Sequence, residues 1–287
     1  MLGRLLFTLG VMCLLSSCRS DIDNLDLPKV QDEKRIVFES ESDFMNTYKA
    51  ISSYDKKGLK DWSCSKKINS LLGELEKNNL EEVCLPQALQ SILNKNAEFQ
   101  IKDSVIRYDN NNFYLIATDN TKLKSPVVVG NVKSNILGNS KLARGYFEIG
   151  VDEIDASNQH EFRWEPNKYL FKYVHELRTY YLAFANSTEY RLSLIVKLEY
   201  KGKKWNVAGE SRKLSLDLTT SVALIPSVIN ETKYNRLSDV VVAGNNEINL
   251  ASYTFLGSPI RQWNVLISGY VAQEIYGYPG TGWIDYR

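Results

Sequence analysis

Residues 190–200 read Tyr-Arg-Leu-Ser-Leu-Ile-Val-Lys-Leu-Glu-Tyr, and this stretch decides the fold class. Apolar side chains occupy every second position, and polar side chains fill the positions between them except at Ile195. Successive side chains of a β-strand point to opposite faces, so the pattern predicts one face on a core and the other towards water. This is the pattern of an antiparallel sheet with one solvated face.

The alternation continues through the C-terminal half of the chain. Lys201-Gly202-Lys203-Lys204 predicts a turn, and Leu214, Leu216 and Leu218 predict a later strand. Further strands are expected at residues 145–151, 168–174, 179–186, 238–243, 248–256 and 262–275. About eight short strands with turns between them are typical of an antiparallel β-sandwich.

The N-terminal part has helical periodicity instead. Apolar side chains recur at helical spacing from Phe44 to Ile51, which predicts a helix near residues 42–54 with Ser40 or Ser42 as its N-cap. Two more short amphipathic helices are expected, at residues 68–75 and 86–93.

From Glu98 the apolar period changes from 3.6 to 2, and turn signals at Lys102-Asp103 and Asp109–Asn112 predict a small hairpin or meander. The expected fold class is therefore α+β, with short N-terminal helices and a small hairpin followed by an antiparallel β-sandwich. The expected parts are a lipoprotein signal peptide (1–17), a tether (18–35), a helical segment with a hairpin (36–118), a linker (119–141) and the sandwich domain (142–287).

The first 18 residues resemble a bacterial lipoprotein signal. Arg4 precedes an apolar run that is too short to span a membrane, and Leu15-Ser16-Ser17-Cys18 reads as a lipobox. We expect cleavage before Cys18 and acylation of its thiol by diacylglyceryl and fatty-acyl groups such as palmitate. The predicted partner of this end is the membrane, and the predicted location is the outer membrane of the cell envelope.

The residues after Cys18 are polar and acidic, with Asp21, Asp23 and Asp26. They resemble the acidic export signal of surface-exposed lipoproteins of the Bacteroidetes. Acidic tethers are common, so surface display and a periplasm-facing anchor both stay open.

Removing residues 1–17 takes away Arg4 alone among the charged residues, so Lys+Arg falls from 35 to 34 and equals Asp+Glu at 34. A chain of zero net charge without a basic block lacks the electrostatic footprint that binds phosphate backbones. The sequence therefore argues against nucleic acid as a partner.

Cysteine use gives one structural expectation. Cys13 would leave with the signal and Cys18 would be acylated, so Cys64 and Cys84 remain as a candidate disulfide pair. In an oxidising envelope, closing a loop of about 20 residues would add roughly 3 kcal/mol of stability. Two buried free thiols are the alternative.

The segments Ile36–Phe44 and Phe99–Asp103, together with the β-rich C-terminal half, resemble uncharacterised lipoproteins of gut Bacteroidetes that are defined by domains of unknown function. The resemblance implies a helical N-terminal segment, a β-rich C-terminal domain and a location in the envelope. It implies no catalytic or binding residue.

The two histidines, His160 and His175, carry no catalytic or metal motif. His175-Glu176 begins like a zinc-protease helix, but Thr179 stands where the second histidine is required. The sequence has no Gly-x-Ser-x-Gly elbow, and Cys64 has no cysteine-enzyme signature. We therefore predict no enzyme, metal or cofactor, although a hydrolase that pairs a distant Ser or Cys with either histidine stays the alternative.

Two other patterns have ordinary structural explanations. Asp152, Glu153 and Asp155 lack the spacing of a calcium loop and are interpreted as a solvated strand end. The glycines at 277, 280 and 282 are not followed by a predicted helix that would hold a phosphate, so they are interpreted as turn residues.

Aromatic residues crowd the C-terminus, where Tyr276, Tyr278, Trp283 and Tyr286 form the candidate binding surface. Aromatic rings give large, rigid contact areas for sugars or proteins. The alternative is that they close the end of the core, which is also the expectation for Trp164, Trp205 and Trp263. The predicted function is a noncatalytic binding or interaction module for glycan or another envelope protein; a hydrolase acting on glycan or peptide, or a subunit of a surface assembly, are the alternatives.

Overall fold

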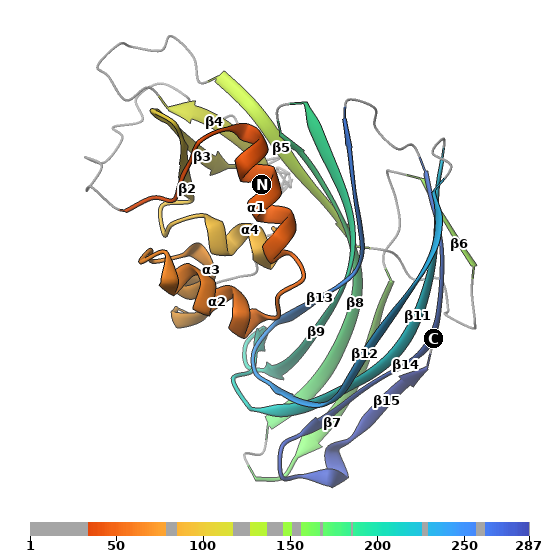
Figure 1. Cartoon of the computed structure of the whole chain (residues 1–287). Coiled ribbons are helices and arrows are strands. Elements are labelled where there is room, and N and C mark those ends of the chain that lie inside the picture. The colour runs from red at the N-terminus through yellow and green to blue at the C-terminus, as the bar shows by residue number, and fades with distance from the viewer. Residues whose placement is uncertain are drawn as a thin grey trace, which may run out of the picture. The chain divides into compact units, whose positions relative to one another are not determined.

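The computed structural model describes residues 34–78, 85–116, 127–136, 146–150, 156–166, 169–184, 186–225, 229–256 and 262–286. Lys34–Arg287 form one compact unit. The described part of this unit is mostly β-strand, with four short helices near its N-terminal end (Figure 1).

The helices and the strands that follow them come first along the chain. They are β1 (Val37–Phe38), α1 (Glu41–Ile51), α2 (Lys56–Ser65), α3 (Leu71–Lys77), α4 (Gln87–Ile92), β2 (Glu98–Ile101), β3 (Ser104–Asp109) and β4 (Asn112–Ile116). The remaining elements are β5 (Val127–Ile136), β6 (Tyr146–Gly150), β7 (Ala156–Trp164), β8 (Tyr169–Phe184), β9 (Ser187–Lys201), β10 (Trp205–Val207), β11 (Arg212–Ile225), β12 (Asn230–Val242), β13 (Asn246–Leu256), β14 (Gln262–Ile275), η1 (Pro279–Thr281) and β15 (Trp283–Tyr286).

The strands form two sheets. The first, sheet A, has ten strands in the order β1-β2-β3-β4-β5-β8-β9-β10, with β7 paired to β8 and β13 paired to β9. The second, sheet C, has five strands in the order β12-β11-β14-β15, with β6 paired to β14. Sheet A is strongly curled into a half-barrel (Figure 1).

One apolar core lies between the two sheets. Leu192, Leu194 and Val196 of β9 contribute from sheet A, and alternate residues such as Leu216 of β11 and Val265 of β14 contribute from sheet C. The alternation seen in residues 190–200 is therefore real, and its apolar face lies on this core.

A second core lies under the helices, on the opposite face of sheet A. Phe44 of α1 stacks on Phe99 of β2 with ring centroids 4.6 Å apart, and Phe184 of β8 joins them. The Ser40 side chain caps α1 by accepting a hydrogen bond from the Asp43 amide at 3.1 Å. The helices thus cover part of sheet A that the sequence alone does not identify as covered.

The meander expected after Glu98 is confirmed, because β2, β3 and β4 pair in succession. Its turns pass through Lys102, Asn110 and Asn111, all at positive φ. Asparagine tolerates this left-handed region better than most residues, which suits it to such turns.

The expected linker at residues 119–141 contains a strand. β5 pairs with β4 on one side and with β8 on the other. It continues sheet A from the N-terminal half of the chain into the C-terminal half, so both halves share one sheet instead of lying in separate domains.

β8 also differs from the expectation of two strands at 168–174 and 179–186. Between those ranges, Glu176 and Arg178 are buried and hydrogen-bond to each other. Glu176 also lies 3.6 Å from Lys197. Because these charges are compensated locally, the strand continues through them as one element of 16 residues.

Candidate functional site

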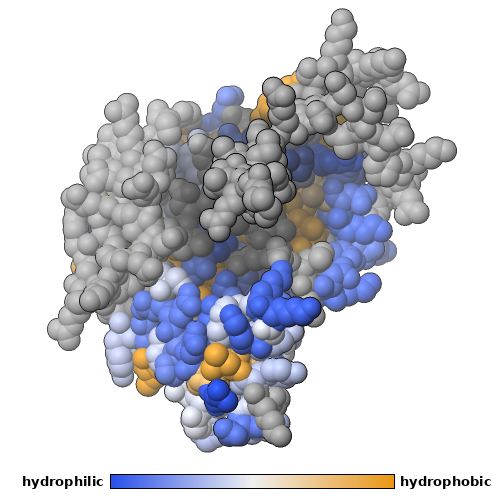
Figure 2. Space-filling view, turned by 180° about the vertical axis from the view of Figure 1, so that it is seen from behind, coloured by the Kyte–Doolittle hydropathy of each residue, from blue (hydrophilic) through white to orange (hydrophobic). Residues whose placement is uncertain are grey.

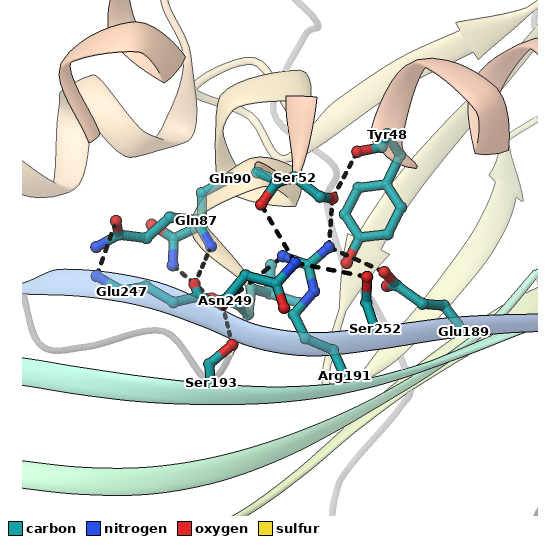
Figure 3. Close-up of polar contacts among 12 residues, drawn as sticks. Tyr48, Ser52, Gln87, Gln90, Glu189, Arg191, Ser193, Glu247, Asn249 and Ser252 are labelled. Carbon is teal, nitrogen blue, oxygen red and sulfur yellow. Dashed lines mark hydrogen bonds and ion pairs between the residues drawn. The ribbon is translucent and has the colours of Figure 1, made fainter. Parts of the chain in front are cut away.

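The polar face of β9 does not face water. Arg191 is 1% exposed and Ser193 is fully buried, and both lie beneath the helices (Figure 3). The expectation that this face is solvated is therefore wrong. One strand's alternation shows that its two faces differ, but it does not show what covers the polar face.

Arg191 is the centre of this first buried site. Its Nη2 donates to Glu189 Oε1 at 3.0 Å and to the Ser52 hydroxyl, and its Nη1 lies 3.7 Å from Glu247 Oε1. Its guanidinium carbon lies 5.0 Å from the centre of the Tyr48 ring. Two carboxylates and an aromatic face thus surround one cation.

Glu247 of β13 connects this site to α4. Its carboxylate accepts hydrogen bonds from the Ser193 hydroxyl at 2.7 Å and from the Gln87 amide at 2.6 Å (Figure 3). The Gln87 side chain in turn accepts from the Glu247 amide at 3.3 Å and donates to the Asn245 carbonyl at 3.1 Å. The N-terminus of α4 is therefore tied to the edge of sheet A.

The electrostatics of the Arg191 site follow from its burial. Burial opposes a charge on Arg191, but the negative charges of Glu189 and Glu247 outweigh this effect and raise its pKa. Burial also raises the pKa of the Tyr48 phenol well above its ordinary value, against the opposing effect of Arg191. The arrangement therefore keeps Arg191 charged and Tyr48 neutral, which suits a structural fastener between helices and sheet.

A second polar site lies on the opposite face of sheet A, within the region between the sheets. His175 of β8 is fully buried, its Nδ1 lies 3.0 Å from Asp285 Oδ2, and its Nε2 lies 2.8 Å from Gln273 Nε2. Asn158 of β7 donates to the other Asp285 oxygen at 2.9 Å. Strands β7, β8, β14 and β15 thus converge on one imidazole.

The donors and acceptors of this second site define one consistent pattern. Arg212 Nε donates to Gln273 Oε1 at 2.5 Å, so the Gln273 amide nitrogen faces His175 and must donate to it. His175 Nε2 is then an acceptor, and the proton lies on Nδ1 towards Asp285. We infer a neutral imidazole held between a carboxylate and an amide.

Arg212 is the second fully buried arginine. Its Nη2 donates to the carbonyls of Val196 at 3.0 Å and Gly244 at 2.7 Å, so these two acceptors and Gln273 are all neutral. Burial lowers its pKa to about 10. Hydrogen bonds connect it through Gln273 and His175 to the carboxylate of Asp285.

The two histidines meet on either side of Trp283. The Trp283 ring stacks on His175 at 4.4 Å and on the exposed His160 at 5.6 Å between centroids. It also lies parallel to Tyr173 at 6.4 Å. Trp283 therefore contributes to closing this end of the core.

The four residues of the candidate aromatic surface do not share one face. Trp283 points inwards, whereas Tyr286 of the same strand is exposed on the outer face of sheet C. Tyr276 and Tyr278 lie in the turn after β14, where Tyr278 packs edge-on against Trp164 at 5.1 Å. Their role in binding stays a prediction.

Two other tryptophans were expected to be packing residues. The Trp205 ring lies beneath Lys172 and Lys201, at 4.5 and 5.0 Å from their amino groups. The side chain of Trp263 lies outside the described residues. Of the interpreted turn glycines, Gly277 has a positive φ, as a turn requires.

Several sequence expectations fall wholly or partly outside the described residues. They concern the signal peptide, Cys18, most of the tether, Cys84 and the cluster of Asp152, Glu153 and Asp155. Cys64 is exposed near the end of α2. Because Cys84 is not among the described residues, the disulfide stays a prediction.

Within the described ranges, no three or more His, Cys, Asp or Glu side chains are grouped so that they could hold a metal ion. None of the described helices is both long and apolar enough to cross a membrane.

No protein-family model and no curated protein matches the chain. Among solved structures, it is similar to a DUF4848 family protein from Bacteroides thetaiotaomicron, at 12% identity over 90% of this chain and 97% of that chain, with a TM-score of 0.23. At this TM-score the likeness carries no argument about fold or function.

Of the residues that form the two sites, His175 was singled out from the sequence, but its partner Asp285 and the residues around Arg191 were not. Arg191 was visible only as a polar position of an alternating strand, and Glu189 lies just before that stretch. Asp285 lies 110 residues from His175, and no local spacing indicates that the two meet.

Proposed function

We propose that this chain is a lipoprotein anchored to the outer membrane through Cys18, and that its β-rich body is a noncatalytic binding or interaction module for glycan or another envelope protein. In this proposal, the two sheets form a sandwich-type scaffold. The lipobox and the acidic tether support the anchor.

The exposed side chains of the C-terminal hairpin carry the binding proposal. Tyr276 is 56% exposed, Ile284 50% and Tyr286 70%, and Tyr270 and Tyr278 are also exposed. Large exposed apolar and aromatic side chains gathered on one short segment mark interaction sites more often than scattered ones do. The buried core beneath them holds this hairpin in place.

The hydrolase alternative rests on the His175–Asp285 pair, since a histidine oriented by a carboxylate is part of a nucleophilic triad. The pair is buried. Gln273 hydrogen-bonds to His175 Nε2, which is the ring nitrogen that would have to contact a nucleophile. This geometry supports a structural role for His175 and favours the binding module.

The test of the binding proposal uses full-length tagged protein purified from membranes. We expect it to capture either a glycan on an array or an envelope protein after cross-linking, and Cys18→Ala should release the protein from the membrane fraction. Empty results from both binding assays with folded protein would contradict the binding module. Firm membrane retention of the Cys18→Ala protein would contradict the anchor.

Asp285→Asn separates the module from the hydrolase. The substitution removes the charge that orients His175 while keeping the shape of the side chain. We expect unchanged ligand capture and no difference in the hydrolysis of glycan or peptide substrates. A hydrolytic activity that falls at least 100-fold in Asp285→Asn, with a retained circular dichroism spectrum, would establish the alternative instead.

A further inference from the structure

The outer face of sheet C lies opposite the core between the sheets. The strand alternation places Tyr234 of β12, Tyr270 of β14 and Tyr286 of β15 on this face, where they are 79%, 36% and 70% exposed. We call this surface the tyrosine face. Its inward-pointing neighbours, such as Val271 and Asp285, are buried, so the backbone beneath it is fixed.

The strand register fixes the arrangement of the rings. Tyr270 is the direct cross-strand partner of Tyr286. Tyr234 lies opposite Thr219, which in turn lies opposite Ser268, the residue two positions before Tyr270. Tyr234 is therefore two strands and two residues away from Tyr270, which is roughly 12 Å at the usual strand spacing and rise per residue. A ligand that contacts both would have to be extended.

The charges of the tyrosine face are mostly compensated within it. Arg236 pairs with Asp217 at 3.0 Å, and Lys213 lies opposite Glu274 on the neighbouring strand. The remaining carboxylate, Asp239, accepts a hydrogen bond from the Ser215 hydroxyl at 3.2 Å. With two cations and three carboxylates among its described side chains on β11, β12 and β14, the face offers no net attraction to a polyanion.

Hydroxyl groups also lie on this face, together with the exposed apolar side chains of Val241, Leu266 and Ile284. The hydroxyl groups belong to residues on the outward positions of β11, β12 and β14, namely Ser215, Thr219, Ser221, Thr232 and Ser268. Ser221 and Thr232 lie 3.0 Å apart and hydrogen-bond across the strands. Rigid rings beside hydroxyl donors and acceptors match a ligand that has both apolar ring faces and many hydroxyls.

We propose that the tyrosine face binds a neutral glycan chain, which lies across the strands and stacks on Tyr270 and Tyr286 with Tyr234 as a third contact. This inference rests on the proposed binding function and assigns it a surface and a ligand class. The internal pairing of the charges selects a neutral polysaccharide over an anionic one. The sequence did not single out Tyr270. It did single out Trp283, but that side chain points away from this face.

Affinity electrophoresis of the full-length protein tests the proposal. The probes are neutral xylan, mixed-linkage glucan, mannan and dextran, with the anionic polysaccharide alginate for comparison. We expect at least one neutral polysaccharide to retard the protein, with little change in 0.5 M NaCl because the contact is uncharged. The double variant Tyr270→Ala/Tyr286→Ala should weaken retardation at least tenfold, and Tyr54→Ala, a matched exposed tyrosine near α2, should leave it unchanged.

Absence of retardation by all four neutral probes would overturn the proposal, as would retardation that the double variant leaves intact or that alginate alone produces. If the double variant instead loses capture of an envelope protein, the face binds protein and the glycan assignment is wrong, while the proposed binding function stands. If neither glycan nor envelope protein is captured by the wild-type chain, the proposed function itself fails. A thermal unfolding curve of the double variant that matches the wild type excludes misfolding as the cause.

Discussion

Two buried arginines lie on opposite sides of the same molecule and are accommodated differently. Arg191, beneath the helices, faces the carboxylates of Glu189 and Glu247. Arg212, which contributes to the core between the sheets, donates to Gln273 and to two backbone carbonyls. The charge of Arg191 is compensated by direct ion pairing, whereas the hydrogen bonds of Arg212 Nε and Nη2 all go to neutral acceptors.

The difference shows in the direction of the two pKa shifts. Carboxylates raise the pKa of Arg191 despite its burial, whereas burial lowers that of Arg212 to about 10. Arg191 is therefore needed to neutralise its neighbours. Arg212 carries a charge that its surroundings oppose. We expect the two residues to respond differently to the same substitution.

The largest effect is expected for Arg191→Met. Methionine fills much of the volume but leaves Glu189 and Glu247 buried without a cation, which costs about 3 to 5 kcal/mol when a buried ion pair is broken. Urea unfolding monitored by circular dichroism measures this loss. Arg236→Met is the control, because this exposed arginine pairs with Asp217 at the surface, and we expect a change within about 0.5 kcal/mol. Equal losses in the two variants would contradict the structural role of Arg191.

A smaller loss is expected for Arg212→Met. The substitution removes hydrogen bonds to Gln273, Val196 and Gly244 but also removes an uncompensated buried charge, so roughly 1 to 2 kcal/mol is expected. The same urea experiment checks the order of the two variants. If Arg212→Met proves as costly as Arg191→Met, the contrast between ion pairing and neutral acceptors does not hold.

The smallest effect is expected in the dependence of stability on alkaline pH. The pKa of Tyr48 is raised, so the folded state holds its phenol proton more tightly than the unfolded state does. The contribution is complete below pH 10 and is lost as pH rises above it, by up to about 1.4 kcal/mol per pH unit. Tyr48→Phe should flatten the fall in unfolding free energy between pH 9.5 and 11.

Tyr173, near Arg212, provides the comparison for that experiment. Burial raises its pKa too, but a hydrogen bond with Thr281 favours the ionised phenol, so its pKa is raised less than that of Tyr48. Tyr173→Phe should therefore change the alkaline profile less than Tyr48→Phe does. A larger change in Tyr173→Phe would contradict this order of the two shifts.

How much the sequence could predict is illustrated by β9. Its alternation correctly predicted a strand and the face that lies on the core between the sheets. It could not predict that the other face, with Arg191 and Ser193, is covered, because the covering helices lie more than 90 residues earlier in the chain. Charges that pair across such distances have the same local pattern as charges that face water.

The sites show the same limit. His175 and Trp283 were both singled out, but for separate roles. Only the curling of β8 and β15 towards each other brings their rings to 4.4 Å. Two strands were expected where β8 runs as one, and the buried pair of Glu176 and Arg178 lies between the two expected ranges. The periodicity of a segment depends on its own residues, whereas the composition of a site depends on how distant segments pair.

The Arg191 site also has a consequence for the timing of folding. Its members extend from Tyr48 in α1 to Glu247 in β13, and Arg191 is made 56 residues before Glu247. At roughly 5 to 20 residues per second, a ribosome needs about 3 to 11 s to cover that interval. Until then the helices lack the carboxylate that ties α4 to the sheet, so we expect the chain to emerge largely unfolded. The proposed lipid anchor would require export before folding, and such a delay suits that proposal.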